Sequence, residues 1–396
     1  MRVVRVMLPV CAALALLGAA CGGGTTTPGA AGPKIFDKVG QGEGELDLIA
    51  WPGYVESGQT DKKVDWVTPF EQQTGCDVKV KYGNTSDEMV NLMRQGGGSV
   101  YDGVSASGDA TNRLIAHGDV AGIDPKIIPS FDQMMPSLQS PPHNTVGGVH
   151  YGVPYMWGPN FLMFNTEKVH PRPTSWDVVF EANSPYAGNI TAYDSPIYIA
   201  DAALFLKTHQ PSLEIKDVYE LTQPQLDAAV NLLKQQSGMI KKYWAVYTDE
   251  VDAFESGDAI IGTAWPVNQA LLLADKEPVA SVIPKEGVTG WADTWMMSSH
   301  AQHPNCMLKW MQYTSRADIQ TQVAEFYGAT PSNAQSCPQL RKDLGKQADT
   351  VYHCGDESFL KAIALWKTPL ADCGNGQNNC TDYSVWTEKW TEIRGA

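Results

Sequence analysis

From Glu45 onward the chain alternates short apolar runs with amphipathic segments of helix length. The alternation is clearest in six consecutive pieces: ELDLIAW (45–51), VDWVTPFEQQTG (64–75), CDVKVKYG (76–83), TSDEMVNLMRQGG (85–97), YDGVSAS (101–107) and TNRLIAHGDV (111–120). Alternating strands and helices predict a mainly parallel α/β sheet, whose ligands usually bind outside the carboxyl ends of the strands. The loops after Ala50 and Ala106 are therefore the first places to look for a site.

The length of the chain predicts two lobes, because the roughly 350 residues after residue 44 exceed what one hydrophobic core usually supports. A second series of strand-like and helical runs begins past VPYMWGPNFLMFN (153–165) and includes NITAYD (189–194), IADAALFLKTH (199–209) and AIIGTAW (259–265). Chain order alone leaves open how often the backbone crosses between the lobes.

The N-terminal stretch MRVVRVMLPVCAALALLGAAC has the pattern of an export signal: a basic start, a short apolar core and small residues before Cys21. Its end, LGAAC, resembles the bacterial lipobox, which predicts a signal peptide over 1–20 and a lipidated Cys21. In the segment 21–44 a glycine and threonine run directly follows Cys21, and the segment is expected to form a flexible tether. The protein would then sit at the outer face of the cell membrane, on the periplasmic side. A secreted protein with an incidental Cys21 is the alternative.

Net charge argues against two classes of partner. Removal of Arg2 and Arg5 with the signal leaves 27 basic against 44 acidic residues, a net charge of about −17. Nucleic acid and anionic lipid surfaces are poor partners for such a chain. The acidic excess also keeps an extracellular protein soluble, so it carries little functional weight by itself.

Six cysteines remain beyond Cys21, and an even number in an oxidising compartment suggests disulfides. Cys373 and Cys380 flank the polar stretch GNGQNN and are the best pair. Cys306, Cys337 and Cys354 offer one further pair, whose members the sequence does not decide. Cys76 lies in an apolar strand-like run and is interpreted as a buried free thiol.

Seven motifs follow one another along the chain: AWPGYV (50–55), YDGVSASGD (101–109), HYGVPYMWG (150–158), SWDVVFEANSPYAGNI (175–190), DEVDAFESGDAIIGTAW (249–265), VIPKEGVTGWADTWMMS (282–298) and VAEFYGATPSN (323–333). In this order they resemble the spermidine/putrescine-binding family of extracellular solute-binding proteins. The resemblance implies a type II periplasmic-binding-protein fold, with two α/β lobes, a hinge and a ligand cleft between them. It also implies a monomer that binds a polyamine of the spermidine/putrescine kind, or a related organic amine, and delivers it to the permease of an ABC importer. On this resemblance the protein is not an enzyme.

The same resemblance implies lobe boundaries. The first lobe is expected over 45–159 with a return over 291–334, and the second lobe over 160–290 with a C-terminal part over 335–396.

Position by position, the resemblance assigns ligand contacts to Trp51, Tyr54, Ser107, Trp265, Trp291 and Asp293. These residue types suit an organic cation, because indole and phenol faces attract ammonium groups by about 0.5–2 kcal/mol each. A carboxylate such as Asp293 pairs with ammonium through a charge-assisted hydrogen bond.

Departures from the family pattern point to a smaller cargo. Asp194 is retained after a strand, but Tyr198 stands at the position of a family glutamate, Asn268 at that of an aspartate, and Ala329 at that of a tyrosine. Asp109 replaces an aromatic residue and is a further candidate contact. With fewer acids, a short diamine, a monoamine or a quaternary ammonium compound suits the site better than a long polyamine.

Other cargoes and activities are the alternatives. The wider superfamily also binds thiamine, phosphonates and ferric ions. His300 and His303 lie near Cys306, but no second ligand pair is spaced for zinc, so we expect neither metal nor cofactor. The usual local motifs of metalloproteases and serine hydrolases are absent. An extracellular enzyme or an adhesion lipoprotein remains the hypothesis from another class.

Overall fold

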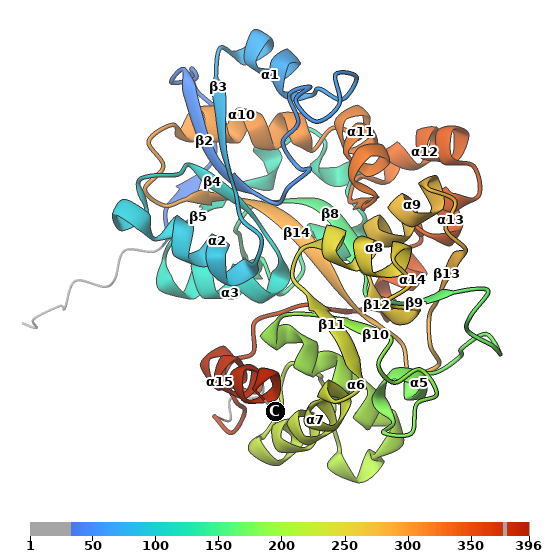
Figure 1. Cartoon of the computed structure of the whole chain (residues 1–396). Helices are drawn as coiled ribbons and strands as arrows, with labels where there is room; N and C mark the ends of the chain where they lie inside the picture. Colours follow the sequence, from blue (N-terminus) through green and yellow to red (C-terminus); the bar gives the residue numbers. More distant parts are fainter. Residues whose placement is uncertain (1–32, 375–377, 396) are drawn as a thin grey trace, which may run out of the picture. The chain divides into compact units, whose positions relative to one another are not determined.

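The computed structural model describes residues 33–374 and 378–395, and Lys34–Ala396 form one compact unit (Figure 1). The predicted signal 1–20, Cys21 and the start of the tether lie outside the described residues. Strand β1 (Ile35–Phe36) pairs with β5 (Val120–Ile123). Ile35 and Phe36, which the sequence prediction placed in the flexible tether 21–44, therefore belong to this sheet.

The larger sheet follows the path β3–β2–β4–β14–β5–β7–β6. Strand β2 (Glu45–Ala50) runs parallel to its two neighbours, as the sequence predicts. The long β14 (Thr289–Ser298) runs antiparallel to β4, β5 and β8, because it returns from the second sheet. The expectation of a mainly parallel sheet is therefore wrong, and the sheet is mixed. Its other strands are β3 (Asp77–Tyr82), β4 (Gly103–Ala106), β6 (Thr145–Val146), β7 (Val149–His150), β8 (Val153–Pro159), β15 (Thr330–Pro331) and β16 (Ala364–Leu365).

The smaller sheet has the order β11–β10–β12–β9–β13. Strand β10 (Ile190–Tyr193) is parallel to β11 (Ile240–Trp244) and β12 (Ile261–Ala264). Strand β9 (Phe161–Asn165) is antiparallel to β12 and β13 (Val279–Val282). This sheet is also mixed, because β9 enters it directly from β8 of the larger sheet.

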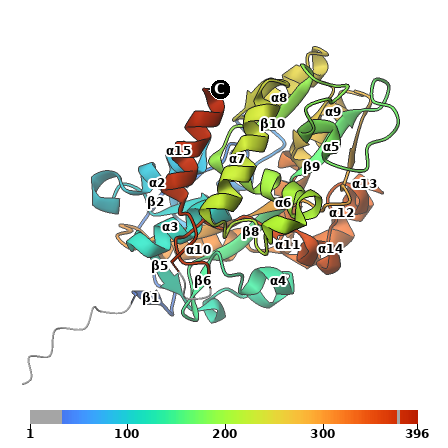
Figure 2. The ribbon, with the colours of Figure 1, turned by 90° about the horizontal axis from the view of Figure 1, so that it is seen from below.

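Helices cover both sheets (Figure 1). On the larger sheet α1 and α10 lie on one side, and α2 and α3 on the other. On the smaller sheet α7 packs against α5, α6 and α15, and Figure 2 shows α15 alongside α7. Within the described residues, no helix is both long enough and apolar enough to cross a membrane. The helices are α1 (Val67–Thr74), α2 (Ser86–Met93), α3 (Gly108–His117), α4 (Pro136–Gln139), α5 (Asp177–Phe180), α6 (Ile199–His209), α7 (Gln223–Ser237), α8 (Tyr247–Glu255), α9 (Pro266–Ala274), α10 (Pro304–Thr314), α11 (Ala317–Tyr327), α12 (Cys337–Leu344), α13 (Gln347–Thr350), α14 (Glu357–Ala362) and α15 (Tyr383–Arg394).

Local signals set the ends of the helices near the site. Thr85 caps α2, because its hydroxyl accepts a hydrogen bond of 3.1 Å from the Glu88 amide. Gly75 and Gly118 end α1 and α3 with φ angles of 71° and 79°, a conformation that glycine adopts without a side-chain clash.

The described chain passes between the two sheets at three places: from β8 to β9, from β13 to β14, and from β16 to α15. The C-terminal part divides between the lobes, since β16 pairs with β14 and α14 packs on α4, whereas α15 packs on α7. These contacts favour a last lobe boundary between β16 and α15 rather than at residue 335.

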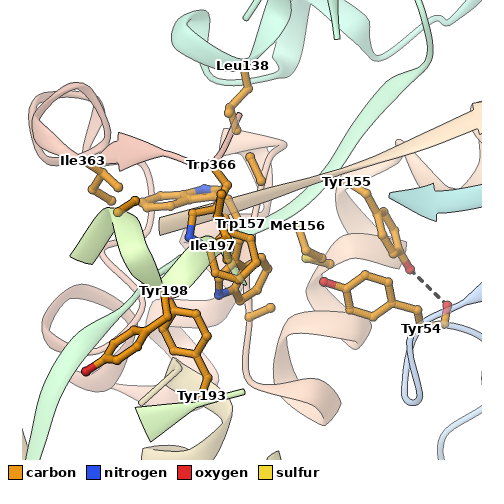
Figure 3. Close-up of a cluster of buried hydrophobic side chains, with 14 of the residues drawn as sticks. Tyr54, Leu138, Tyr155, Met156, Trp157, Tyr193, Ile197, Tyr198, Ile363 and Trp366 are labelled. Atoms are coloured by element: carbon orange, nitrogen blue, oxygen red, sulfur yellow. Dashed lines mark hydrogen bonds between the residues drawn. The ribbon is translucent and has the colours of Figure 1, made fainter. Parts of the chain in front are cut away.

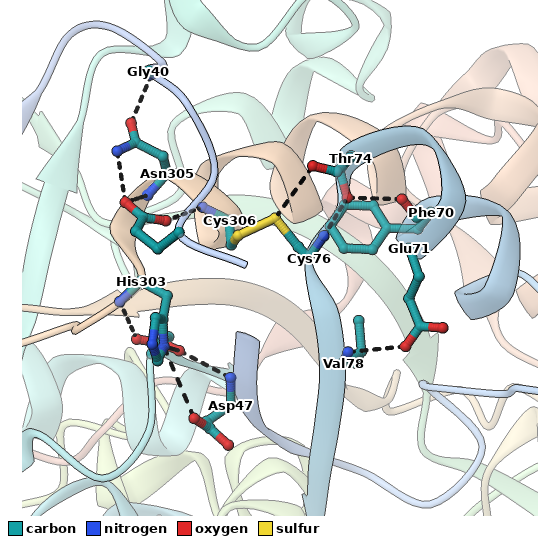
Figure 4. The surroundings of a disulfide bond; sticks show 12 residues. Gly40, Asp47, Phe70, Glu71, Thr74, Cys76, Val78, His303, Asn305 and Cys306 are labelled. Atoms are coloured by element: carbon teal, nitrogen blue, oxygen red, sulfur yellow. Dashed lines mark hydrogen bonds and ion pairs between the residues drawn. A yellow bond between two sulfur atoms is a disulfide. The ribbon is translucent and has the colours of Figure 1, made fainter. Parts of the chain in front are cut away.

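Three disulfides join the six cysteines of the described chain. Cys373–Cys380 is confirmed, and Cys337–Cys354 supplies the further pair. Cys76 pairs with Cys306 across 230 residues (Figure 4), so its interpretation as a free thiol is wrong. The apolar run around Cys76 gives no sign of the disulfide, because the partner Cys306 comes from the distant helix α10.

Candidate ligand-binding cleft

Two small adjoining cavities lie where strands of both sheets end. The first measures about 20 Å³ and the second about 40 Å³, each room for a very few water molecules. They share Trp51, Trp265 and Trp366 as walls, and we call the two together the cleft. The first is lined by Trp51, Ser107, Trp265, Trp291, Asp293, Tyr327 and Trp366, and the second by Trp51, Asn84–Ser86, Tyr193–Ser195, Trp244, Ala245, Trp265 and Trp366.

The strands place these residues because each strand ends just before a lining residue. Strand β2 ends at Ala50, so Trp51 follows it, and Ser107 follows β4 in the same way. On the smaller sheet Asp194 follows β10 and Trp265 follows β12. The loops after Ala50 and Ala106, where the sequence predicts a site, border the cleft.

Trp265 lies at the centre of the aromatic wall. Its ring centroid lies 4.6 Å from that of Trp244, 6.3 Å from those of Trp291 and Tyr193, and 6.4 Å from that of Trp366. Three of these contacts are edge-to-face and the one with Tyr193 is tilted. Such contacts are favourable and fix the orientation of each ring, so the cleft presents a rigid aromatic wall.

Asp293 is the carboxylate of the first cavity. Its side chain is buried and accepts a hydrogen bond of 2.6 Å from the Tyr54 hydroxyl and another from the Ser107 hydroxyl. Burial raises the pKa of Asp293 to about 7, against the lowering effect of the two hydroxyl donors. Among the described residues no lysine, arginine or histidine forms an ion pair with it.

Tyr54 acts on the cleft through Asp293. The Tyr54 ring does not line either cavity and is fully buried, in edge contact with Tyr327 at 4.8 Å and Tyr155 at 5.1 Å. The Tyr155 hydroxyl donates a 3.4 Å hydrogen bond to the Tyr54 carbonyl (Figure 3). Tyr54 is thus placed to orient the carboxylate rather than to touch a ligand.

Asp194 lines the second cavity and is already engaged. Its Oδ1 atom accepts a 2.8 Å hydrogen bond from the Trp390 indole and lies 3.2 Å from Nε of Arg394. Asp109 lines neither cavity. It is fully buried at the start of α3, accepts a 2.9 Å hydrogen bond from Ser86, and has its pKa raised to about 6 by burial.

Tyr198 and Asn268 lie outside the cleft lining. Tyr198 is buried in the core of the smaller lobe, where its hydroxyl accepts a 2.9 Å hydrogen bond from Gln236. Asn268 supports Trp265, because its Oδ1 accepts a 2.9 Å hydrogen bond from the Trp265 amide while its Nδ2 donates to the Tyr247 carbonyl.

Four lining aromatics were not singled out from the sequence: Tyr193, Trp244, Tyr327 and Trp366. Trp366 packs 5.6 Å from Tyr193 and comes from the segment between β16 and α15 (Figure 3), where the sequence shows no regular pattern. Tyr193 could have been considered, because it lies in the predicted strand NITAYD (189–194) directly before the candidate contact Asp194. Tyr327 could also have been considered as a lining residue, since it belongs to the motif VAEFYGATPSN.

One of the histidines considered for zinc, His303, belongs to a small polar cluster. Its ring bonds Asp102, whose carboxylate also accepts backbone-amide hydrogen bonds from Asp47 and from His303 itself. Asp47, Asp102 and His303 lie close enough together to hold an ion. The protein's own donors engage both oxygens of Asp102, so the cluster is explained as a structural link between β2 and the start of α10.

Two mixed sheets, three connecting passages and a cleft at the strand ends define a two-lobed binding protein of the type II periplasmic class. The chain belongs to the family of bacterial extracellular solute-binding proteins, whose model matches residues 65–345.

Individual relatives agree with this family. The spermidine/putrescine-binding periplasmic protein of Escherichia coli is 24% identical over 77% of this chain and 84% of its own length. The putrescine/cadaverine-binding protein of Pseudomonas aeruginosa is 20% identical over 88% of this chain and 93% of its own. The solved substrate-binding protein of a spermidine/putrescine ABC transporter from Streptococcus pneumoniae superposes with a TM-score of 0.68 at 18% identity, covering 88% of this chain and 97% of its own.

Proposed function

We propose that this chain is the extracytoplasmic solute-binding component of an ABC importer and that its cleft holds a small organic amine. The observation that carries the proposal is Asp293, a buried carboxylate whose hydrogen-bond donors are two neutral hydroxyls. An ammonium group beside it would supply the missing positive charge, and the surrounding rings would add cation–π attraction.

The lining of the cleft argues against anionic cargo. Among the described residues that line the two cavities there is no lysine, arginine or histidine. A phosphonate or a carboxylate cargo would need such donors. Clustered tyrosines and acids for a ferric ion are not found there either, since Tyr193 and Tyr327 line different cavities. The cargo named for the relatives, spermidine, putrescine and cadaverine, is of the cationic class that this lining suits.

The amine would hold the two lobes together. Trp51, Ser107 and Asp293 belong to the larger sheet or its loops, and Trp265 follows a strand of the smaller sheet. A ligand that contacts both sets favours the closed arrangement, which the permease then recognises. A micromolar dissociation constant needs only about −8 kcal/mol, which several ring contacts and one ion pair can supply. The proposed role is binding and release, with no catalytic step.

The proposed location is the outer face of the cell membrane, with Cys21 lipidated after removal of residues 1–20, and the proposed form is a monomer. Expression of the full chain and of Cys21→Ser tests the anchor. The unchanged chain should fractionate with membranes and carry the lipid mass, and the variant should be released. Equal release of both forms would favour a secreted protein.

The binding proposal is tested by calorimetric titration with spermidine, putrescine and choline. Residues 22–396 retain the whole compact unit and serve for the titration. We expect saturable binding of at least one amine, weakened about ten-fold or more by Asp293→Asn, which removes the charge but keeps the shape. Asp132→Asn, an exposed carboxylate away from the cleft, is the matched control. A folded protein that binds none of the three would contradict the proposal.

A further inference from the structure

We propose that Arg394 removes the advantage that a second positive charge would give an amine in the cleft, because it pairs with Asp194, the second of the two carboxylates of the cleft. The inference rests on the proposed function, the binding of an organic amine in the cleft, and adds its charge class. It follows from three observations: which charged groups line the cleft, what already engages Asp194, and how Arg394 is held.

Asp293 and Asp194 are the only charged side chains among the described residues that line the two cavities. Asp293 is bonded by two neutral hydroxyls, so its ionised form has an uncompensated charge. Asp109 does not add a third charge to the lining. It lies behind Ser86, with the Arg113 Nε atom donating to its carbonyl at 3.1 Å.

Asp194 differs from Asp293 because a cation of the protein already pairs with it. The Trp390 indole and Arg394 Nε both contact the same oxygen, Oδ1, at 2.8 and 3.2 Å. Trp390 and Arg394 are four residues apart on α15, so both side chains lie on one face of that helix. The Asp194 end of the cleft is therefore close to electrically neutral.

Packing holds Arg394 in this position. Its guanidinium carbon lies 4.1 Å from the centre of the Tyr243 ring, in cation–π geometry. Tyr243 in turn meets Trp390 edge-on at 5.7 Å, and β11, which carries Tyr243, pairs with β10 just before Asp194. The Tyr243 ring, the Trp390 indole and the Asp194 carboxylate together hold the guanidinium in one position. A mobile ion pair on the surface would not be held in this way.

The consequence for cargo is a matter of charge balance. One ammonium group can be neutralised by Asp293. A second ammonium group toward Asp194 would meet a carboxylate already paired and an arginine beside it, so it would lose water without gaining a full ion pair. A diamine should therefore gain little over a monoamine with the same carbon chain.

The test compares n-butylamine with putrescine, which share four carbons and differ by one ammonium group. Binding of both is measured by calorimetry for the unchanged protein and for Arg394→Met. We expect the unchanged protein to bind putrescine no more than about three-fold more tightly than butylamine. In Arg394→Met the affinity for putrescine should rise about ten-fold, and that for butylamine should stay within about two-fold. The expected rise is moderate because the Arg394 and Asp194 side chains are 39% and 29% exposed.

Lys389→Met is the matched control. It removes the same charge from the same helix. Lys389 pairs with Glu392 at a distance of 2.6 Å and makes no ion pair with Asp194. It should shift both amines by the same small factor. Asp194→Asn in the Arg394→Met background should cancel the gain for putrescine. Arg394→Gln should act in the same direction and replaces the methionine variant if that variant does not fold.

Two results would overturn the inference. One is an unchanged ratio of the two affinities in folded Arg394→Met and Arg394→Gln; the other is an unchanged protein that already prefers putrescine ten-fold or more. Either would leave the proposed amine binding intact, since binding itself is then observed. Binding of neither amine, nor of spermidine or choline, would instead overturn both proposals.

Discussion

The Tyr54 hydroxyl donates a 2.6 Å hydrogen bond to Oδ2 of Asp293, joining the loop after β2 to a strand 239 residues further along the chain. The bond helps to fix the orientation of this buried carboxylate. With the hydroxyl of Ser107 it also favours the ionised form, against the raising effect of burial on the pKa of Asp293. The carboxylate is thereby poised to change its charge near neutral pH.

Amine binding should strengthen as the pH rises. A cation pairs with ionised Asp293, and the pKa of this carboxyl without ligand is about 7. The dissociation constant should therefore fall by up to about ten-fold per unit between pH 5 and pH 7 and level off above it. Calorimetry at four pH values, in two buffers of different ionisation enthalpy, would also detect the released proton. Asp293→Asn should bind weakly with a flat profile; a flat profile in the unchanged protein would show that Asp293 is not the cation partner.

Removal of the Tyr54 hydroxyl should weaken binding at neutral pH. Tyr54→Phe keeps the buried ring but deletes one donor to the carboxylate, so the pKa of Asp293 rises further. We expect a loss of about ten-fold in affinity at pH 7 and a smaller loss at pH 8.5, since a hydrogen bond to a charged group contributes about 1.5–3 kcal/mol. Tyr82→Phe, which deletes a 2.7 Å hydrogen bond to the Val55 carbonyl, is the control and should bind normally. Equal losses in the two variants would argue against the assigned role.

The sequence predicts the cleft best where a lining residue directly follows a strand. Trp51 and Ser107 fall in this class, because the alternation of strands and helices predicts a site in the loops after Ala50 and Ala106. Trp265 also follows a strand, but the family resemblance is what points to it. Asp293 lies inside the buried strand β14, where the neighbouring residues are mostly apolar and no strand end marks it. Only the family resemblance points to Asp293. The same resemblance gives the two-lobed fold.

The sequence predicts poorly what depends on contacts between distant segments. Tyr198 stands at a family contact position, but the apolar surroundings of α6 bury its ring against Phe180 and Tyr193. Trp366 belongs to a passage without regular structure. The pairing of Asp194 with Arg394 joins residues 200 apart, which no local pattern can show. Tertiary packing, rather than propensity, decides all three.

The ligand-free protein should lose stability as the pH rises from 5 to 8. Burial raises the pKa of Asp201 from an ordinary 3.8 to about 7, although Tyr193 and Thr289 donate hydrogen bonds to it. Between these two values the folded state holds a proton that the unfolded state has released, so the free energy of unfolding falls with pH. Urea denaturation at pH 5 and pH 8 should show this fall. In Asp201→Asn the fall should be smaller by about 1–4 kcal/mol. Asp132→Asn should keep it in full, and a stability that rises with pH would contradict the buried neutral carboxyl.

Removal of the Cys76–Cys306 disulfide should destabilise the protein most among the three. The three disulfides close loops of 230, 17 and 7 residues. In the chain-entropy model these loops correspond to stabilisation of the folded state by about 5, 3 and 2 kcal/mol. Cys76 and Cys306 are also fully buried, between α1 and α10 (Figure 4). Urea denaturation of the three paired Cys→Ser variants under non-reducing conditions would measure the order. Cys373→Ser/Cys380→Ser is the internal control, because it removes a bond near the surface. A smaller loss for Cys76→Ser/Cys306→Ser than for this control would mean that the long loop is already constrained in the unfolded chain.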